Sequence, residues 1–227
     1  MSNDILVGVL LGIVLTCLVY YAFHQMAKKV KTPFFNPVLM SILVLVFILL
    51  KIGVPYEKYN RGGQVINFFL GPITVMFAIP IFKQMQVLKS NFIAIIAGVM
   101  TGVFSSLVSV LGLSKLFKVD HAFMLSLIPK SITTPMGVAT SETIGGIVSI
   151  TIVAIIISGI TGNIIAPILC DKLNITHPIA RGIAIGSSSH AMGTIKAFEM
   201  GELEGAMSSL SIGVTGLATV ILIPLLM

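Results

Sequence analysis

Six apolar stretches of this chain are each long enough to cross a lipid bilayer as a helix, which takes about 20 residues. Lys, Pro, Gly or Asn residues mark their ends, as expected where helices stop at short loops. Only 10% of the residues are charged, against about 25% in a typical soluble domain. This low charge disfavours a soluble enzyme, a nucleic-acid binder and a disordered chain. The sequence therefore predicts an all-α, polytopic membrane protein with long spans at Ile5–Phe23, Pro37–Val54, Gln64–Phe82, Phe92–Leu113, Ile144–Leu169 and Leu203–Met227.

The basic residues behind the formal net charge of +6 lie mainly in the loops between these stretches. We expect them to contact lipid headgroups and not nucleic acid. Alternate loops carry similar numbers of them, so the positive-inside rule does not fix the orientation. We expect the first apolar stretch to be retained as a span and not cleaved as a signal peptide.

Motifs for catalysis, cofactors and metals are missing from the sequence. It contains no P-loop, no dinucleotide fingerprint and no HExxH. Cys17 and Cys170 lie within or at the end of apolar runs and indicate neither a disulfide framework nor a metal site. We therefore expect a protein without enzymatic activity, cofactor or metal.

Two further stretches, His121–Glu142 and Pro178–Met200, are interrupted. Each begins with a short apolar piece, breaks into a segment rich in Ser, Thr, Pro or Gly, and resumes as a second short piece. A piece this short cannot span about 30 Å of hydrocarbon as a helix. Broken backbone at membrane depth is tolerated where it is buried in protein or lines a wet cavity. Both stretches are predicted to be discontinuous helices or re-entrant hairpins.

The two interrupted stretches resemble each other at an offset of 56 residues. A long apolar helix follows each of them. This pattern predicts an internal repeat of inverted orientation, as in secondary transporters. The alternative is that biased composition alone produces the matches. Within one transmembrane domain over residues 1–227, we expect scaffold helices in 1–120 and repeat units in 121–176 and 177–227. The matched pairs are His121 with His177, Ser131 with Ser187, Met136 with Met192, Gly137 with Gly193, and Gly145 with Gly201.

The first break carries Lys130, Ser131, Thr133, Thr134 and Pro135. A half-helix beginning near Pro135 presents free N–H groups and a positive dipole end. With the hydroxyls and the lysine charge, this makes a candidate site for a carboxylate. Two other interpretations stay open: the lysine extends to the membrane interface, and the hydroxyls cap a kinked helix.

The second break carries Ser187, Ser188, Ser189, His190 and Thr194. Small residues let a ligand or another backbone approach closely. His190 is either a proton-coupling or substrate-contacting residue, or a neutral histidine hydrogen-bonded between helices.

Other polar side chains are candidates for coupling or for lining the cavity. Arg181 is either a substrate counter-charge or an interfacial anchor. Lys196 and Glu199 are spaced to pair along a helix, and the amides within spans are expected to bond across helices. The full candidate set is Glu142, Glu199, Lys196, Arg181, Asn67 and Asn163.

Three segments of the chain resemble the LrgB/CidB family of bacterial membrane proteins. They are LGPITVMFAIPIF at Leu70–Phe82, PKSITTPMG at Pro129–Gly137, and SSSHAMGTIKAFEMGELEGAMSSL at Ser187–Leu210. The resemblance implies modulation of murein hydrolase activity and autolysis, an antiholin-type role, and a small holin-like LrgA/CidA partner. It also implies transport, because a plastid relative carries glycolate and glycerate and bacterial relatives are linked to pyruvate uptake.

From the residues and this resemblance together, we expect a multi-pass protein of the bacterial plasma membrane, in a homo-oligomer. Its leading expected function is to carry small monocarboxylates of the pyruvate, glycolate and lactate class by alternating access, with an LrgA/CidA-type partner. One alternative is a non-transporting regulator of a holin-like protein, murein hydrolase activity and autolysis. Another is a holin-like pore.

Overall fold

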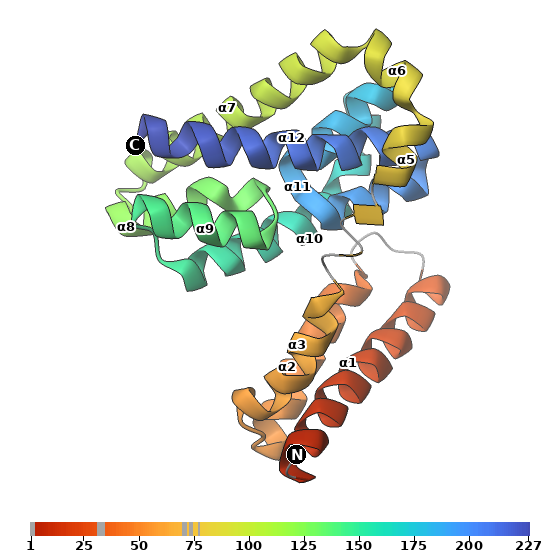
Figure 1. Ribbon diagram of the computed structural model, residues 1–227, viewed down its shortest axis with the longest axis vertical. Coiled ribbons are helices and arrows are strands. Elements are labelled where there is room, and N and C mark those ends of the chain that lie inside the picture. The colour runs from red at the N-terminus through yellow and green to blue at the C-terminus, as the bar shows by residue number, and fades with distance from the viewer. Residues whose placement is uncertain (1–2, 31–34, 70–71, 73–74, 77) are drawn as a thin grey trace. The chain divides into compact units, whose positions relative to one another are not determined.

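The computed structural model describes residues 3–30, 35–69, 72, 75–76 and 78–227, and every regular element in these residues is a helix (Figure 1). The prediction of an all-α chain is confirmed. The chain divides into two compact units, Met1–Met76 and Phe77–Met227. The finer division at residues 120 and 176 remains a prediction.

The first unit contains α1 (Asn3–Lys29), α2 (Pro37–Ile52) and α3 (Tyr56–Phe68). Helix α1 packs against both α2 and α3. Gly12 and Gly62 let the backbones of α1 and α3 approach closely, since a Cβ on Gly62 would lie 2.6 Å from the Gly12 Cα. The hydroxyls of Thr16 and Tyr59 bond across this contact at 2.7 Å.

The second unit holds the remaining helices. In chain order they are α5 (Ala78–Lys83), α6 (Met85–Ser90), α7 (Phe92–Leu116), α8 (His121–Leu127), the 3₁₀ helix η1 (Ile128–Ser131), α9 (Thr134–Ile144), α10 (Val148–Lys172), α11 (Pro178–Met200) and α12 (Glu202–Leu226). Gly182 and Gly186 of α11 meet the backbone of α12, so these two helices pack closely.

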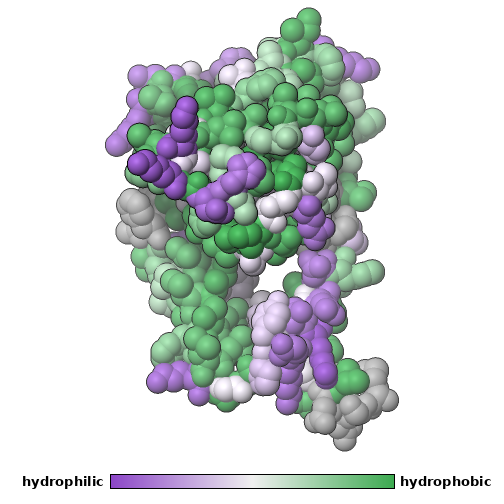
Figure 2. All heavy atoms as spheres, turned by 90° about the vertical axis from the view of Figure 1, so that its left-hand side faces the viewer, coloured by the Kyte–Doolittle hydropathy of each residue, from purple (hydrophilic) through white to green (hydrophobic). Residues whose placement is uncertain are grey.

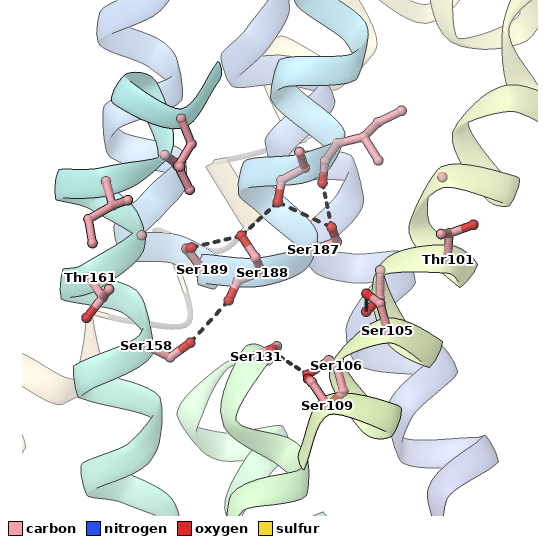
Figure 3. A pocket seen from close by; sticks show the side chains of 18 of the residues that line it. Thr101, Ser105, Ser106, Ser109, Ser131, Ser158, Thr161, Ser187, Ser188 and Ser189 are labelled. Carbon is pink, nitrogen blue, oxygen red and sulfur yellow. Dashed lines mark hydrogen bonds between the residues drawn. The ribbon is translucent and has the colours of Figure 1, made fainter. Parts of the chain in front are cut away.

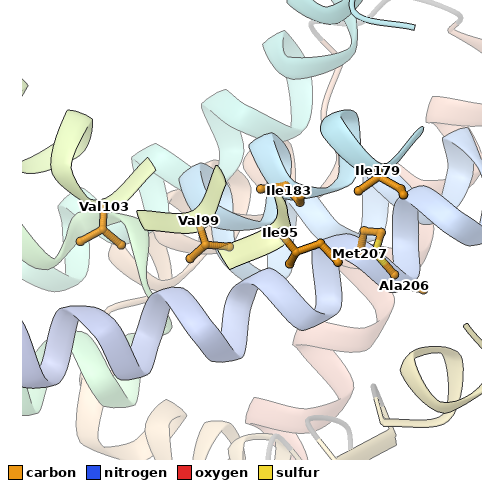
Figure 4. Packing of buried hydrophobic residues seen from close by; sticks show 7 residues of the cluster. All are labelled: Ile95, Val99, Val103, Ile179, Ile183, Ala206 and Met207. Atoms are coloured by element: carbon orange, nitrogen blue, oxygen red, sulfur yellow. The ribbon is translucent and has the colours of Figure 1, made fainter. Parts of the chain in front are cut away.

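One buried apolar cluster joins three helices of this unit (Figure 4). Its side chains interlock between α7, α11 and α12, which fixes the spacing of the three helices. A second cluster packs α7 against α8 and the end of α12. The first cluster consists of Ile95, Val99, Val103, Ile179, Ile183, Ala206 and Met207.

Four described helices are long and apolar enough to cross a membrane, namely α1, α7, α10 and α12, and α2 is a shorter apolar helix. Six long spans are therefore not confirmed. The predicted span Gln64–Phe82 covers the end of α3, which stops at Phe68, and all but the last residue of α5, which starts at Ala78; residues 70–71, 73–74 and 77 between them lie outside the described residues. Hydrophobic side chains cover large areas of the face drawn in Figure 2, as a lipid-facing surface requires.

The helix is interrupted in both places that the sequence predicted. After η1, Ile132 and Thr133 are extended (ψ 176° and 150°) before α9 begins. Within α11, His190 has φ 41° and ψ −142°, which kinks the helix. In both predicted repeat units, 121–176 and 177–227, a short helix, a break and a second short helix precede a 25-residue helix. The inverted orientation of these two repeat units remains a prediction.

Candidate functional site

A pocket of about 1250 Å³ lies in the second unit, between α7, η1, α10 and α11 (Figure 3). Both interruptions reach it. Lys130 and Ser131 come from the first break, and Ser187, Ser188 and Ser189 come from the second. The two predicted breaks are distant in sequence, yet residues of both line one largely apolar cavity and add a lysine and hydroxyl groups to it.

Helix α7 supplies a wall of this pocket because its surface is divided into three faces. One face packs into the apolar cluster of Figure 4. Thr101, Ser105 and Ser109 follow one another at four-residue spacing and line the pocket on a second face. Ile93 and Val108 are exposed on the third. The helix therefore separates an apolar exterior and core from a cavity with hydroxyl groups.

Lys130 is anchored inside the pocket by a short chain of hydrogen bonds. Its ammonium donates to the Ser106 Oγ at 2.7 Å, and the Ser106 Oγ lies 3.1 Å from the Ser131 Oγ. Since the Ser106 oxygen accepts from the lysine, its own proton can be donated to Ser131. An ammonium has three donors, so further N–H groups remain for a ligand.

The three serines before the kink bond within their own helix and to α10. The Ser187 and Ser188 hydroxyls donate to the carbonyls of Ile183 and Ala184, each at 2.7 Å. Ser158 of α10 donates to the Ser188 carbonyl at 3.2 Å. A serine hydroxyl can rotate from such a bond toward a ligand, so these groups can either donate to or accept from a solute.

Two glycines let α11 come this close to its neighbours. A Cβ on Gly102 of α7 would lie 2.8 Å from the Ser187 Oγ, and one on Gly162 of α10 would overlap the Ser189 side chain. Both positions need the absence of a side chain because the serines occupy that space.

His190 and Thr194 do not line the pocket. The His190 ring is buried, with its Nε2 2.9 Å from the Ile155 carbonyl of α10. The Thr194 hydroxyl lies 2.9 Å from the His190 carbonyl, to which it donates, and 2.7 Å from the Ser208 Oγ of α12. The geometry is that of a histidine bonded between helices, and its contact with a substrate remains a prediction.

Three candidates of the first break lie outside the pocket lining as well. Thr133 is the N-cap residue of α9, but its side chain makes no capping hydrogen bond. Thr134 and Pro135 open α9, and the proline is suited to the first turn because that turn needs no N–H there.

The outer polar candidates form local contacts. Arg181 bonds to Asp171 at 2.6 Å and to the Ile175 carbonyl, an arrangement that ties the start of α11 to the last turn of α10 and the loop after it. Lys196 and Glu199 pair at 2.7 Å, as their spacing predicted. Neither pair reaches the pocket lining.

The remaining candidates are more dispersed. Asn163 of α10 donates to the Met192 carbonyl of α11 at 2.8 Å, so this amide bonds across helices as expected. Glu142 is exposed on α9. Asn67 is exposed on α3, in the first unit.

Sequence reasoning missed the hydroxyl faces of the two unbroken helices. Helix α7 adds Thr101, Ser105, Ser106 and Ser109, and α10 adds Ser158 and Thr161. The signal was a row of Gly, Ser and Thr at three- and four-residue spacing inside an otherwise apolar span, which marks a close-packing or polar face.

The charged side chains described in the pocket lining are basic and not acidic. Among the described residues that line it, Lys130 is the sole Lys or Arg, and none is Asp or Glu. His177 is the one histidine of the lining. A solute anion entering this cavity therefore meets a cation and hydroxyls without an opposing carboxylate.

Comparison with known proteins gives a consistent set of relatives. The model of the LrgB-like family matches residues 16–227. The "Uncharacterized protein YxaC" of Bacillus subtilis is 40% identical over 88% of this chain and 86% of its own length. The "Antiholin-like protein LrgB" of Bacillus mycoides is 37% identical over 95% of this chain and 94% of its own, and that of Bacillus cereus is 36% identical over the same shares. No solved structure matches the chain.

Proposed function

Since the chain belongs to the LrgB-like family, we propose that it is a multi-pass protein of the bacterial plasma membrane that carries small monocarboxylates. The pocket shared by the two breaks carries this proposal. Its lining is mainly apolar, but it holds one lysine and no carboxylate among its described residues, and four separate elements contribute hydroxyls.

The chemistry of the pocket fits a small hydroxy- or keto-carboxylate. A carboxylate accepts charge-assisted hydrogen bonds from Lys130, and a second oxygen on the solute bonds to nearby serine hydroxyls. The volume of about 1250 Å³ exceeds that of such a solute, so the pocket can admit the solute together with water. Helix breaks beside the solute give the chain points at which half-helices can pivot during alternating access.

Uptake of labelled pyruvate and glycolate into proteoliposomes tests the carrier. Lys130→Met is expected to lower uptake at low solute concentration about tenfold or more, because a charged hydrogen bond is lost. Lys115→Met is the matched control, since this lysine is exposed at the end of α7 and away from the pocket. Uptake should be measured with and without a co-reconstituted LrgA/CidA-type protein. No movement of any small carboxylate in either preparation would refute the carrier.

A second candidate is a non-transporting, antiholin-like regulator of murein hydrolase activity and autolysis, acting on a holin-like LrgA/CidA-type partner. The Bacillus mycoides and Bacillus cereus relatives, which are named antiholin-like proteins, favour it. Detergent-induced lysis of cells lacking the gene measures this role. Faster lysis that is restored equally by the unmodified protein and by Lys130→Met supports regulation independent of the pocket.

A further inference from the structure

A small second cavity lies behind the lysine anchor, enclosed by α7, the first break and α12. Its volume is about 10 Å³, and its polar lining residues are Ser106, Ser131, Thr215 and Thr219. Ser106 and Ser131 also line the large pocket. These two serines therefore separate the proposed anion site from a closed space on the side of α12.

Thr215 is distinctive among the side chains that the structure describes. Its residue is 1% exposed, and its hydroxyl is the one buried side-chain polar atom of the described residues without a hydrogen-bond partner. Ser209 and Ser211 of the same helix donate to the carbonyls of Gly205 and Met207. Because an unsatisfied buried hydroxyl is costly, a partner in the small cavity is expected.

We propose that this cavity binds one water molecule, which links the Thr215 hydroxyl to Ser131 and Ser106 and makes Thr215 a positioning residue for Lys130. The volume approaches the roughly 10–15 Å³ that one buried water requires, and a water needs two to four polar partners. The four hydroxyls of the lining supply them.

A metal cation is a poorer occupant for two reasons. Magnesium and calcium ions prefer carboxylate and carbonyl oxygens, and the polar side chains of this lining are all hydroxyls. The Lys130 ammonium bonds to the Ser106 Oγ at 2.7 Å, and that residue also lines the cavity, so a positive charge already lies close by. Water is uncharged and can both accept from and donate to these groups.

The water would act on the anion site through Ser106 and Ser131. A hydroxyl that is held by a water behind it keeps a defined orientation toward the lysine in front of it. The occupant of the cavity is inferred from its own geometry, whereas the consequence for anion affinity rests on the proposed function.

Thermal unfolding of the full chain in lipid nanodiscs tests the water without requiring transport. Thr215→Val keeps the shape and removes the hydroxyl, and should lower the unfolding midpoint by about 2 °C or more because the water and serines lose a partner. Thr215→Ser keeps the hydroxyl and should stay closer to the unmodified protein. Thr143→Val is the control, since its exposed hydroxyl donates within its own helix.

Opposite results overturn the proposal. A midpoint that rises or stays unchanged in Thr215→Val means that the site is dry or that Thr215 turns to a carbonyl of its own helix. A midpoint raised by sodium but not by potassium or choline, and only when Thr215 is present, means that a cation is bound. If Thr215→Val does not fold, a structure of the unmodified protein that shows ordered waters decides between a bridged and an empty cavity.

The positioning role has its own readout in uptake. Thr215→Val should raise the KM for the carboxylate severalfold with little change in kcat, and Thr215→Ser should restore it. A fall in kcat alone, or no rescue by serine, overturns the positioning role. If the unmodified protein carries no carboxylate, the proposed function fails while the unfolding result for the water site still stands.

Discussion

The two helix breaks face one pocket but are built in different ways. The first lies between Pro129 and Pro135, and Ile132 and Thr133 within it are extended. The second has no proline at its kink and centres on His190, a residue with positive φ. The first break is therefore specified largely by local sequence, because prolines remove backbone donors and restrict their neighbours.

The second break depends on its neighbours in space. The His190 ring bonds to the Ile155 carbonyl and occupies the space over Gly159 of α10, while Ser189 fills the space over Gly162. A non-glycine residue at φ 41° costs free energy that the surrounding packing must offset. This difference leads us to expect that changes in α10 disturb the second break far more than the first.

The largest effect is expected for Gly162→Val. A side chain there overlaps both the Oγ and the Cβ of Ser189, and the Cβ cannot move away by rotation. We expect a loss of about 3 kcal/mol or more in the free energy of unfolding, the upper range for overpacking. Denaturant or thermal unfolding of the purified protein measures it.

Two glycines serve as controls for that substitution. Gly137→Ala near the first break meets the flexible Cδ1 end of Ile155 at 2.5 Å, so it should cost less than about 1 kcal/mol. Gly213→Ala meets no atom within 4 Å and should stabilise α12 by about 0.5–1 kcal/mol. Equal losses at Gly137 and Gly162 would contradict the proposed difference between the breaks.

A smaller loss, about 2 kcal/mol, is expected for His190→Ala, which removes the bond to Ile155 and leaves a cavity. Pro135→Ala at the first break should change stability by only about 0.4–1 kcal/mol, because Ile132 and Thr133 can keep their extended conformation. His121→Ala is the control, since this histidine is exposed at the start of α8. Unfolding of the three variants under one condition compares their free energies of unfolding directly. A loss for Pro135→Ala as large as that for His190→Ala would count against local specification of the first break.

The sequence predicted both breaks because their composition is unusual for apolar spans. Prolines and hydroxyls mark the first, and the run from Gly186 to Gly193 marks the second. Five of the predicted candidates, Lys130, Ser131 and Ser187–Ser189, line the pocket, and their contact with a substrate stays a prediction. Local patterns can locate an interruption because backbone donors and acceptors without helical partners need other polar groups to hydrogen-bond with.

The sequence could not predict which hydroxyls would meet across helices. Thr133 and Thr194 are as polar as Ser131 and Ser189, yet they do not line the pocket. Their direction depends on helix rotation, which is fixed by long-range packing such as the cluster of Ile95, Val99 and Met207. Likewise, the apolar run Gln64–Phe82 resembled a span because hydropathy records composition and not where α3 ends at Phe68.

The two breaks are also expected to contribute unequally to solute affinity. Lys130→Met should weaken apparent carboxylate affinity about tenfold, and Ser188→Ala only about threefold, because a neutral hydrogen bond contributes less than a charged one. If one solute touches both breaks, the double variant should be weaker than the unmodified protein by less than the product of the single effects. Concentration-dependent uptake measures all three variants. Strictly multiplicative effects would mean that the two residues contribute independently and are not coupled through the solute.

The smallest effects concern the N-cap residues of α8 and α9. The Asp120 carboxylate accepts from the backbone N–H groups of Ala122 at 3.0 Å and Phe123 at 3.4 Å, and so caps α8. Asp120→Ala should cost about 1 kcal/mol, whereas Asp120→Asn retains an acceptor and should cost less. Thr133 caps α9 without a side-chain hydrogen bond, so Thr133→Ala should change the free energy of unfolding by less than about 0.5 kcal/mol.

The Thr133→Ala substitution thereby distinguishes a capping role of this hydroxyl from a role in solute binding. A loss near that of Asp120→Ala would show that its hydroxyl caps α9 in solution. If Thr133→Ala leaves stability unchanged but lowers uptake severalfold, the hydroxyl contacts the solute during the transport cycle, as the sequence predicted. If both stability and uptake stay unchanged, the first break contributes to the pocket through Lys130 and Ser131, and the extended backbone at Thr133 serves only to turn the chain into α9.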